Sequence, residues 1–367
     1  MRKLGEIAEI KTGNKDTQNK VENGIYPFFV RSNTVERINT YSYDGEAILT
    51  SGDGVGVGKN FHYINGRFDF HQRVYSIRNF KDGYDGKYIY SVFSEKFYDR
   101  VIRLSAKNSV DSVRMNMISE MKVSFPMFNE QLKIASFLTM IGDRIETQKK
   151  IIEQLETLMR ANREKLFSQK LRFKDEQANY FSDWNLTELK NVCFIIGGGT
   201  PDTQKPEFWN GNIQWFTPTE IKSNFAFKSE RTITELGLKN SSAKILPKGS
   251  ILLTTRATIG EVAIAQEECT TNQGFQSLIV KENCNNVFLF YWIKENKFEL
   301  IRRANGSTFP EISKSEIELI KISLPPLEEQ TKIANFLFSI QEKIETEKQI
   351  LEKLELQKKF LLANLFV

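Results

Sequence analysis

Two histidines and three cysteines are the residues of this chain best suited to hold a transition metal or act as nucleophiles. His62 and His71 lie nine positions apart in an aromatic-rich stretch, and no cysteine is near them. Cys193, Cys269 and Cys284 are scattered and form no CxxC pair. Because a zinc site needs about four grouped ligands, we expect no metal site. Dispersed thiols are typical of small buried apolar groups in a reducing compartment.

Three short motifs share features with nucleotide-binding or catalytic sites. The stretch GDGVGVG (52–58) lacks GxGxxG spacing, and neither a helical pattern nor a ribose-binding acid follows it. The sequence PDTQK (201–205) begins like a nuclease motif, without a partner acid at a suitable spacing. The Pro-Pro pair at 325–326 stands in LPPL, not in the (Asp/Asn/Ser)-Pro-Pro-(Tyr/Phe) motif of an amino-group methyltransferase. A loop near nucleic acid or a plain turn explains GDGVGVG, and LPPL stands at a helix start, so the sequence does not support catalysis by this chain.

Composition places the chain among globular proteins with two or more domains. It has 367 residues, of which 40% are hydrophobic and 26% charged. No apolar run is long enough to span a membrane, and residues 1–11 carry acids where a secretory signal needs apolar residues. We therefore expect a cytoplasmic location. The net charge of +5 is too small for a general basic coat, so any contact with nucleic acid should depend on particular loops.

A repeat about 200 residues apart is the most informative feature of the sequence. EQLKIASFLTMIGDRIETQKKIIEQLE (130–156) matches EQTKIANFLFSIQEKIETEKQILEKLE (329–355) at 16 of 27 positions without a gap, at an offset of 199. The match extends upstream to Pro126 and Pro325. Such identity indicates an internal duplication.

Each repeated segment carries apolar residues at alternating steps of three and four, which is the seam of a coiled coil. The seam positions are Ile134, Leu138, Ile141, Ile145, Ile152 and Leu155, followed by Met159 and Leu166, and then Ile333, Leu337, Ile340, Ile344, Leu351 and Leu354, followed by Leu361 and Leu365. One seam position is polar in both copies, Gln148 and Glu347, and a buried polar pair there would fix the register. A single amphipathic helix packed on its own domain is the alternative, but globular helices are seldom this long.

The segments around the repeats contain short β-branched and aromatic runs separated by Gly, Asn, Asp and Pro, which predict mainly β domains. A helical pattern precedes each long helix, at 87–104 and 287–304. The expected fold is α+β, with two mainly β domains separated by two long antiparallel helices that form a coiled coil with pseudo-two-fold symmetry. The expected parts are a first domain at 1–125, a central helix at 126–168, a linker at 169–182, a second domain at 183–324 and a C-terminal helix at 325–367.

The second domain resembles the target recognition domains of type I restriction–modification specificity subunits. The residues that carry the resemblance are GGGTPDTQKPEFWNGNIQWFTPTEI (197–221), ITELGLKNSSAKILPKGSILLTTRATIG (233–260), TNQGFQSLIV (271–280) and KISLPPLEEQTKIANFL (321–337). KVSFPMFNEQLKIASFL (122–138) is a looser copy of the last segment. The first domain departs from this pattern in one respect. Trp184 stands five residues before Leu189 in the second domain, whereas Leu4, which corresponds to Leu189, has no matching tryptophan before it in the given sequence.

The resemblance implies a non-catalytic subunit in which each domain reads one half of a bipartite site in double-stranded DNA. It implies that the helices set the spacing between half-sites and dock two methyltransferase subunits of an adenine-methylating complex, with restriction (motor-nuclease) subunits as further partners. Cofactors then belong to the partners: S-adenosylmethionine to the methyltransferase, and ATP and Mg²⁺ to the restriction subunit. None is expected on this chain.

Base reading needs donors and acceptors on loops, and Lys or Arg for phosphates. The candidates in the first domain are Lys15, Arg31, Asn33, Ser51, Lys59, His71, Gln72 and Arg73, and those in the second are Thr200, Lys205, Thr217, Thr219, Thr255, Arg256, Asn272 and Gln273. For any one of them, a hydrogen bond that braces its own loop is at least as good an explanation. Trp209 and Trp215 fit a core position better than base stacking.

Two other functions remain compatible with the sequence. An assembly scaffold could use the coiled coil without binding DNA, and a gel-shift assay with and without methyltransferase would separate it from a DNA reader. A specificity cassette kept for recombination with an active gene is the second, and neighbouring genes would identify it.

Overall fold

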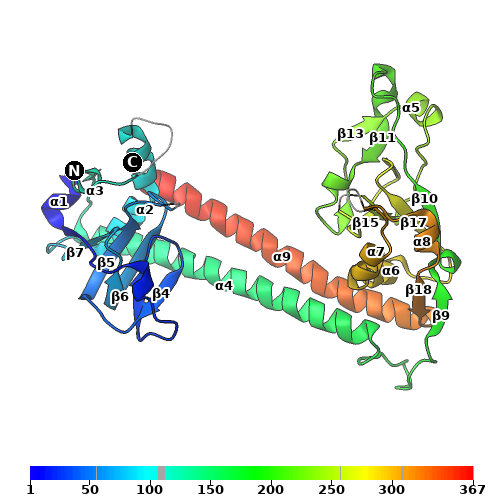
Figure 1. Cartoon of the computed structure of the whole chain (residues 1–367), viewed down its shortest axis with the longest axis horizontal. Coiled ribbons are helices and arrows are strands. Elements are labelled where there is room, and N and C mark those ends of the chain that lie inside the picture. The colour runs from blue at the N-terminus through cyan, green and yellow to red at the C-terminus, as the bar shows by residue number, and fades with distance from the viewer. Residues whose placement is uncertain (55, 106–111, 257, 307–309, 367) are drawn as a thin grey trace. The chain divides into compact units, whose positions relative to one another are not determined.

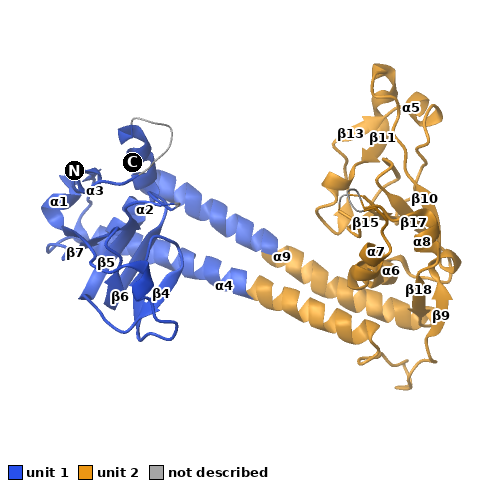
Figure 2. Cartoon of the chain, in the orientation of Figure 1, with its two compact units in different colours: residues 1–150, 348–367 blue, residues 151–347 orange. Residues whose placement is uncertain are grey.

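The computed structural model describes residues 1–54, 56–105, 112–256, 258–306 and 310–366. The chain divides into two compact units, coloured separately in Figure 2: unit 1 is Met1–Lys150 with Lys348–Val367, and unit 2 is Ile151–Glu347. Each unit therefore combines one mainly β domain with parts of both long helices. Within the expected domains, Val55, 106–111, Ala257 and 307–309 lie outside the described residues, as does Val367 at the end of the expected C-terminal helix.

A six-stranded sheet forms the domain of unit 1 (Figure 1). Its order is β2-β7-β5-β6-β3-β4, and neighbouring strands are antiparallel except β3 and β6, which are parallel. The strands are β2 (Glu9–Thr12), β3 (Tyr26–Phe29), β4 (Val35–Ile38), β5 (Tyr43–Ser51), β6 (Phe61–Phe70) and β7 (Val74–Arg78). A separate short pair joins β1 (Arg2–Lys3) to β8 (Lys122–Val123).

Helix α2 (Gly86–Leu104) closes the core of unit 1, and it confirms the helical pattern predicted at 87–104. The Asp85 side chain caps it by accepting a hydrogen bond from the Tyr88 amide at 2.7 Å. Its buried apolar face packs with Ile48 and Ile77 of the sheet. The remaining short helices of the domain are α1 (Leu4–Ile7), the 3₁₀ turn η1 (Thr17–Asn19) and α3 (Met115–Ser119).

The domain of unit 2 uses two larger sheets, with orders β10-β17-β14-β15-β12 and β13-β11-β16. Their strands are β10 (Cys193–Gly197), β11 (Trp209–Phe216), β12 (Phe225–Ala226), β13 (Arg231–Ile233), β14 (Ile251–Leu253), β15 (Val262–Ala265), β16 (Cys269–Thr271) and β17 (Gln276–Val280). A further pair joins β9 (Asn185–Glu188) to β18 (Lys321–Leu324).

The helices of the second domain are short. They are η2 (Leu189–Asn191), η3 (Pro206–Phe208), η4 (Pro218–Glu220), α5 (Glu235–Lys239), α6 (Asn286–Glu295), α7 (Lys297–Arg302) and α8 (Lys314–Glu318). The pattern at 287–304 predicted one helix, and this was wrong because Asn296 ends α6 and begins α7. The buried side chains of α6 include Phe288, Tyr291 and Trp292, so this helix fills the core as α2 does in unit 1.

The two domains share one topology. The order β2-β7-β5-β6 in unit 1 corresponds to β10-β17-β14-β15 in unit 2. In unit 1 the ten-residue β6 also pairs in parallel with β3, through Phe28 and Phe29. In unit 2 a separate strand, β16, makes the equivalent parallel pair with β11. One long strand of unit 1 is thus divided into β15 and β16 in unit 2.

The long helices are α4 (Phe128–Phe167) and α9 (Leu327–Leu365). Both begin two residues later than expected, at Phe128 and not Pro126 and at Leu327 and not Pro325, because the prolines lie in the segments before the helices. Among the described residues, none of the helices combines the length and apolar content needed to cross a lipid bilayer.

Parts of both helices lie side by side in each unit (Figure 2). In unit 1 the core includes Ile134 and Leu138 of α4 with Leu361 and Leu362 of α9, and Lys149 lies 3.7 Å from Glu355, so the helices run antiparallel there. All the seam positions up to Leu155 and Leu354 are buried or half-buried, as are Met159, Leu166 and Leu361, whereas Leu365 is exposed. The polar seam residues Gln148 and Glu347 are buried, each within its own unit.

A buried glutamine fixes the start of each long helix to its domain. In unit 1 the Gln131 side chain accepts from the Asp85 amide at 3.1 Å and donates to the carbonyl oxygens of Gly83 and Pro126. In unit 2 Gln330 repeats the three bonds, with Asn285, Asn283 and Pro325. Each glutamine therefore joins the N-terminal end of a long helix to the N-cap of the core helix.

Candidate DNA interface

The candidate residues of the first domain lie in loops that meet around the C-terminal ends of β2, β3 and β5. The amide of Gln72 donates to the Lys15 carbonyl at 2.8 Å, and the Asn60 side chain donates to the Arg31 carbonyl at 3.0 Å. Gly13 packs so tightly against the backbone of Phe70 that a β-carbon would overlap it. Loops that are distant in sequence thus form one continuous surface in unit 1.

Asp53 organises the charged part of this surface. Its two carboxylate oxygens accept from Arg31 at 3.4 Å and from Arg73 at 2.9 Å. The Arg31 and Arg73 side chains keep 46% and 63% exposure, whereas Asp53 keeps 18%. Two guanidinium groups are therefore held by a common acid and remain open to a ligand, as a guanine edge or a phosphate would require.

Ser51 and His71 are not available for direct base contact. Each is 2% exposed. The Ser51 hydroxyl accepts from the Asn60 amide group at 3.3 Å, and His71 Nδ1 accepts from the Arg73 amide at 2.9 Å. Their prediction as DNA-binding residues is therefore corrected to a bracing role, since their polar atoms are turned into the domain.

The other candidates of the first domain lie nearer to solvent. Gln72 is exposed and donates to Asp16 at 3.2 Å, and Lys15 is half-buried, 4.0 Å from Asp69. Lys59 is exposed with its ammonium group 4.6 Å from the centre of the Tyr98 ring. Asn33 is exposed on the loop that follows β3.

Protonation of His71 should destabilise unit 1. Burial, and to a smaller extent the charge of Arg31, lowers the pKa of His71 below its ordinary value of 6.5. The unfolded chain then binds a proton that the folded chain excludes, so stability is complete above about pH 6.5 and falls as the pH decreases below it, by up to about 1.4 kcal/mol per pH unit. Burial also lowers the pKa of His62.

His71→Asn is therefore expected to reduce the fall in melting temperature between pH 7.5 and pH 5.5, measured by calorimetry. The reason is that the variant takes up about one proton fewer on unfolding. Asparagine keeps the bond because Asn272, its counterpart in unit 2, accepts from the Gly274 amide in the same way, at 2.8 Å. His62→Gln, which removes the other histidine whose pKa is lowered by burial, is measured in parallel so that the two contributions to the pH dependence can be separated. An unchanged pH dependence in His71→Asn would contradict the role given to His71.

Several candidates of the second domain also brace their loops. Thr255 is fully buried, and its hydroxyl donates to the Gly274 carbonyl at 3.1 Å, so its prediction as a base contact is corrected. Half-buried Asn272 holds the turn at Gly274, and the Thr200 hydroxyl donates to Gln273. Gln273 itself is exposed.

Thr217, directly after β11, is the N-cap of the short 3₁₀ turn η4. The Thr217 hydroxyl donates to Glu220 at 2.7 Å and lies 3.1 Å from the Thr219 hydroxyl. Thr219 is exposed, as is Lys205, whose ammonium group stacks 5.1 Å from the Phe208 ring centre. Of this group, Thr219 and Lys205 offer the freest polar atoms.

The two tryptophans of this region are core residues, as predicted. Trp209 and Trp215 are 7% and 4% exposed, with ring centres 5.0 Å apart. Their indole N–H groups donate to the carbonyl oxygens of Asp202 and Gly199. The guanidinium of Arg231 stacks 3.6 Å from the Trp209 ring centre.

Arg256 is the most prominent charged candidate of unit 2. It is 48% exposed in its side chain and pairs with Glu311 at 2.9 Å. Glu311 belongs to the segment between α7 and α8, and Ile312 fastens this segment by donating to the Thr255 carbonyl at 3.2 Å. Arg256 is thus oriented by an acid, as the arginines of unit 1 are.

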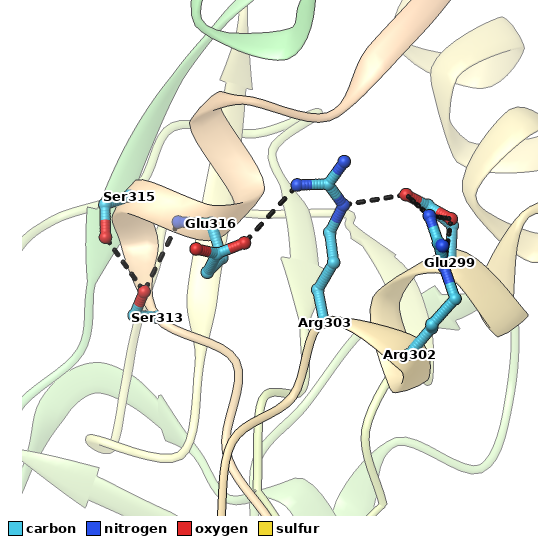
Figure 3. Close-up of polar contacts among 6 residues, drawn as sticks. All are labelled: Glu299, Arg302, Arg303, Ser313, Ser315 and Glu316. Carbon is cyan, nitrogen blue, oxygen red and sulfur yellow. Dashed lines mark hydrogen bonds and ion pairs between the residues drawn. The ribbon is translucent and has the colours of Figure 1, made fainter.

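A polar network anchors both ends of that segment (Figure 3). Arg303 donates to Glu299 at 2.7 Å and to Glu316 at 3.3 Å, and Arg302 also donates to Glu299. Hydrogen bonds from Arg302, and to a smaller extent those from Arg303, lower the pKa of Glu299. Ser313 caps α8 by accepting from the Glu316 amide. The network joins the end of α7 to the start of α8 and so fixes the base of the loop that carries Glu311.

Matching backbone bonds show which positions of the domains are equivalent. The Gly52 amide donates to the Arg73 carbonyl, as the Thr255 amide donates to the Gly274 carbonyl. The His71 amide donates to Phe29 as the Asn272 amide donates to Phe216. These pairs align Arg31 with Pro218, Asp53 with Arg256 and Arg73 with Gly274. Three equivalent loop positions therefore carry Arg, Asp and Arg in one unit and Pro, Arg and Gly in the other.

Sequence reasoning missed Asp53, Asn60 and Glu311, which position the predicted arginines and serine. The GDG triplet around Asp53 indicated a turn, but a turn motif does not indicate which distant arginines it meets.

The three cysteines are buried free thiols, as predicted, and burial raises the pKa of each to about 12. In the described part of the chain, no cluster of His, Cys, Asp or Glu could hold a metal ion.

Comparison with known proteins identifies the family. The model described as "Type I restriction modification DNA specificity domain" matches residues 1–157 and 181–356. The chain belongs to this family. The prediction that the chain is related to type I specificity subunits is thereby confirmed.

Individual members of the specificity family support the same assignment. The chain is 40% identical over 194 residues to the MjaIX specificity subunit of Methanocaldococcus jannaschii, a match that covers 50% of this chain and 44% of that subunit. It is 29% identical over 282 residues to the putative MjaX specificity subunit of the same organism, covering 74% and 64%. The matches thus span less than two thirds of these relatives.

A solved structure confirms the fold class. The S subunit of a type I restriction–modification system from M. genitalium superposes with a TM-score of 0.71, over 100% of this chain and 95% of that one, at 18% identity. At this identity the similarity establishes the fold of two recognition domains and long helices, and not the bases read.

Proposed function

We propose that this chain is the DNA-reading subunit of a type I restriction–modification complex, in which each domain reads one half of a bipartite site. The observation that carries the proposal is the pair of equivalent surfaces with different side chains. The bracing bonds of Gly52 and Thr255 are alike, whereas Asp53 and Arg256 at the next position have opposite charges. A common scaffold with different exposed groups is what two separate half-site preferences require.

The reading groups we assign in unit 1 are the exposed ones that an acid orients, chiefly Arg31 and Arg73, with Gln72, Asn33, Lys15 and Lys59 beside them. In unit 2 we assign Arg256, with Gln273, Thr219 and Lys205. Thr200, Thr217 and Asn272 have a supporting role, because their polar atoms are engaged in the turns that present the others.

The long helices are proposed to dock two methyltransferase subunits. On α4, Phe128, Leu132 and Met140 recur on one face and are 44%, 41% and 59% exposed. On α9, Leu356 and Phe360 are 59% and 67% exposed. Exposed apolar stripes on helices are typical of protein interfaces. In this proposal the methyltransferase holds S-adenosylmethionine, and restriction subunits, if they join, use ATP and Mg²⁺.

Domain exchange tests the division of labour. Co-expressing the chain with a methyltransferase subunit and mapping methylated adenines by single-molecule sequencing should yield one bipartite site. Replacing residues 183–320 with another family domain should change one half of that site, and replacing 1–125 should change the other. A change in both halves after one replacement would contradict the proposal, as would methylation by the isolated chain.

A further inference from the structure

A cavity of about 640 Å³ lies in unit 1 between β6, α2 and the parts of α4 and α9 that belong to this unit. Its volume falls within the range of roughly 300–1,000 Å³ that is typical of sites for small ligands. The lining includes Tyr63 of β6, Tyr90 and Ser91 of α2, Thr139 of α4 and Lys358 of α9. It contains none of the residues that we assign to DNA reading.

Helix α6 of unit 2 carries an aromatic ring where α2 carries the small side chain of Ser91. Asp85 and Asn285 are the N-caps of the two helices, so Ser91 is equivalent to Tyr291. Tyr291 is 2% exposed, and its hydroxyl donates to the Leu337 carbonyl of α9 at 3.4 Å. In unit 2 this tyrosine therefore fills the space between the core helix and the long helix that stays open beside Ser91.

Two further rings of unit 2 have no counterpart in unit 1. The offset of 199 aligns Thr139 with Phe338, whose ring centre lies 5.8 Å from that of Phe225. Phe225 belongs to β12, which pairs in parallel with β15 at Ile264. In unit 1 β3 pairs only with the C-terminal end of β6, so no strand of the described residues covers Tyr63, which takes the place of Ile264. The cavity is thus open because unit 1 lacks the rings that fill the same place in unit 2.

Unit 1 also carries hydroxyl groups around this space. Tyr90 stands where unit 2 has Phe290, and its ring centre lies 5.9 Å from that of Tyr63. The Tyr63 hydroxyl donates to Glu46 at 2.6 Å. The Tyr90 hydroxyl is half-buried and has no hydrogen-bond partner among the described residues. One wall of the cavity therefore offers two aromatic faces and a free hydroxyl.

Lys358 supplies the positive charge of the interior. The other charged residues of the lining are exposed, whereas Lys358 is half-buried. Its ammonium nitrogen lies 3.9 Å from the position that a β-carbon on Gly142 would occupy. Lys149 pairs with Glu146 and Glu355, but in the part of the chain that the structure describes Lys358 has no ion pair. A partly buried, unpaired ammonium group beside an open space favours an anion as the occupant.

We propose that this cavity binds a small aromatic molecule that carries one anionic group. The aromatic ring lies against Tyr63 and Tyr90, in the space that Tyr291 and Phe338 fill in unit 2, and the anionic group faces the Lys358 ammonium. The Tyr90 hydroxyl donates a hydrogen bond to a polar atom of the ligand. This site goes beyond the DNA-reading role of the domain and does not depend on it.

The fluorescent dye anilinonaphthalene sulfonate, an aromatic anion, provides the probe. Titrated into the full chain, it should bind saturably at one site. The double variant Ser91→Tyr with Thr139→Phe gives unit 1 the rings of unit 2 and should weaken binding about tenfold or more. Thr147→Phe is the matched control and should leave binding within about twofold. Thr147 is also exposed on α4 and donates to the carbonyl four residues earlier, as Thr139 does, but it does not line the cavity.

The anionic group is tested separately. Lys358→Gln should weaken binding of the dye about tenfold, and Lys353→Gln, at an exposed lysine of α9 outside the cavity, should change it by less than about twofold. Phenylnaphthylamine, which lacks the sulfonate, should bind the unaltered chain about tenfold more weakly than the dye does. Equal affinities for the two compounds would contradict an anionic ligand.

Competition distinguishes the sources of such a ligand. Displacement of the dye by adenosine monophosphate would identify a nucleotide, and displacement by naphthalene carboxylate alone would identify an aromatic acid of another kind. Displacement by neither would overturn the proposal, as would the absence of saturable binding or binding that survives the double variant. Loss of binding on addition of a methyltransferase subunit would assign the space to that partner and overturn a small-molecule site. Circular dichroism verifies that each variant is folded, and Lys358→Gln, which only shortens one side chain, keeps the test decisive if the double variant is not.

Discussion

Arg172→Ala is expected to destabilise unit 2 by about 3–5 kcal/mol, which approaches the whole stability of an ordinary domain. The substitution removes both guanidinium bonds to Glu329, whose carboxylate is fully buried. It also releases the carbonyl oxygens of Phe181 and Ser182, to which Arg172 donates. A buried charge without its partner is costly because neither water nor protein then solvates it.

Differential scanning calorimetry would measure this loss, and the duplication supplies a matched control. Glu130→Ala alters the equivalent acid of unit 1, which is exposed, and should change stability by less than about 0.5 kcal/mol. The double variant Arg172→Met with Glu329→Leu should recover part of the loss, since two apolar groups remove the unpaired charge. Equal effects of Arg172→Ala and Glu130→Ala would contradict the buried-pair explanation.

Arg73→Ala is expected to weaken recognition of one half-site by about 1–3 kcal/mol, or roughly 5- to 150-fold in affinity. The Arg73 guanidinium is exposed yet held by Asp53, so its planar donors are already oriented for a base edge or a phosphate. Asp53→Ala should have a smaller effect in the same direction, because both arginines remain but lose their orientation.

Competition binding of the assembled complex to DNA with single base changes would measure the effect. If Arg73 reads a base, Arg73→Ala should relax the preference at one position of one half-site. If it contacts only phosphate, all sequences should weaken alike and the salt dependence should decrease. Arg67→Ala is the control, since Arg67 pairs with Asp44 on the β5–β6 hairpin, away from these loops. An Arg73→Ala complex with unchanged affinity would remove Arg73 from the interface.

The sequence was sufficient for the features that repeat locally. Period and identity located α4 and α9 to within two residues, and the β-branched and aromatic runs correctly indicated that the domains are rich in strands. It was insufficient where long-range pairing decides the structure. No periodicity distinguishes the continuous β6 from the divided β15 and β16, because the division depends on which strands pair on either side.

The candidate site illustrates the same limit at the level of side chains. Residue type correctly placed Arg31, Arg73 and Arg256 on exposed loops, but it placed Ser51, His71 and Thr255 there too. Hydroxyl and imidazole groups satisfy buried turns as readily as they bind ligands, and only their partners distinguish the two uses. The acids that orient the arginines, Asp53 and Glu311, could not be recognised before the loops were brought together.

The near-duplicate units differ in one respect that makes them separately observable. All four tryptophans and all three cysteines of the chain belong to unit 2, and both histidines belong to unit 1. Indole fluorescence therefore reports on unit 2 alone, while imidazole proton resonances report on unit 1 alone. Each half of the molecule carries its own intrinsic spectroscopic probe, so ligand binding or unfolding can be assigned to one half without introducing any label.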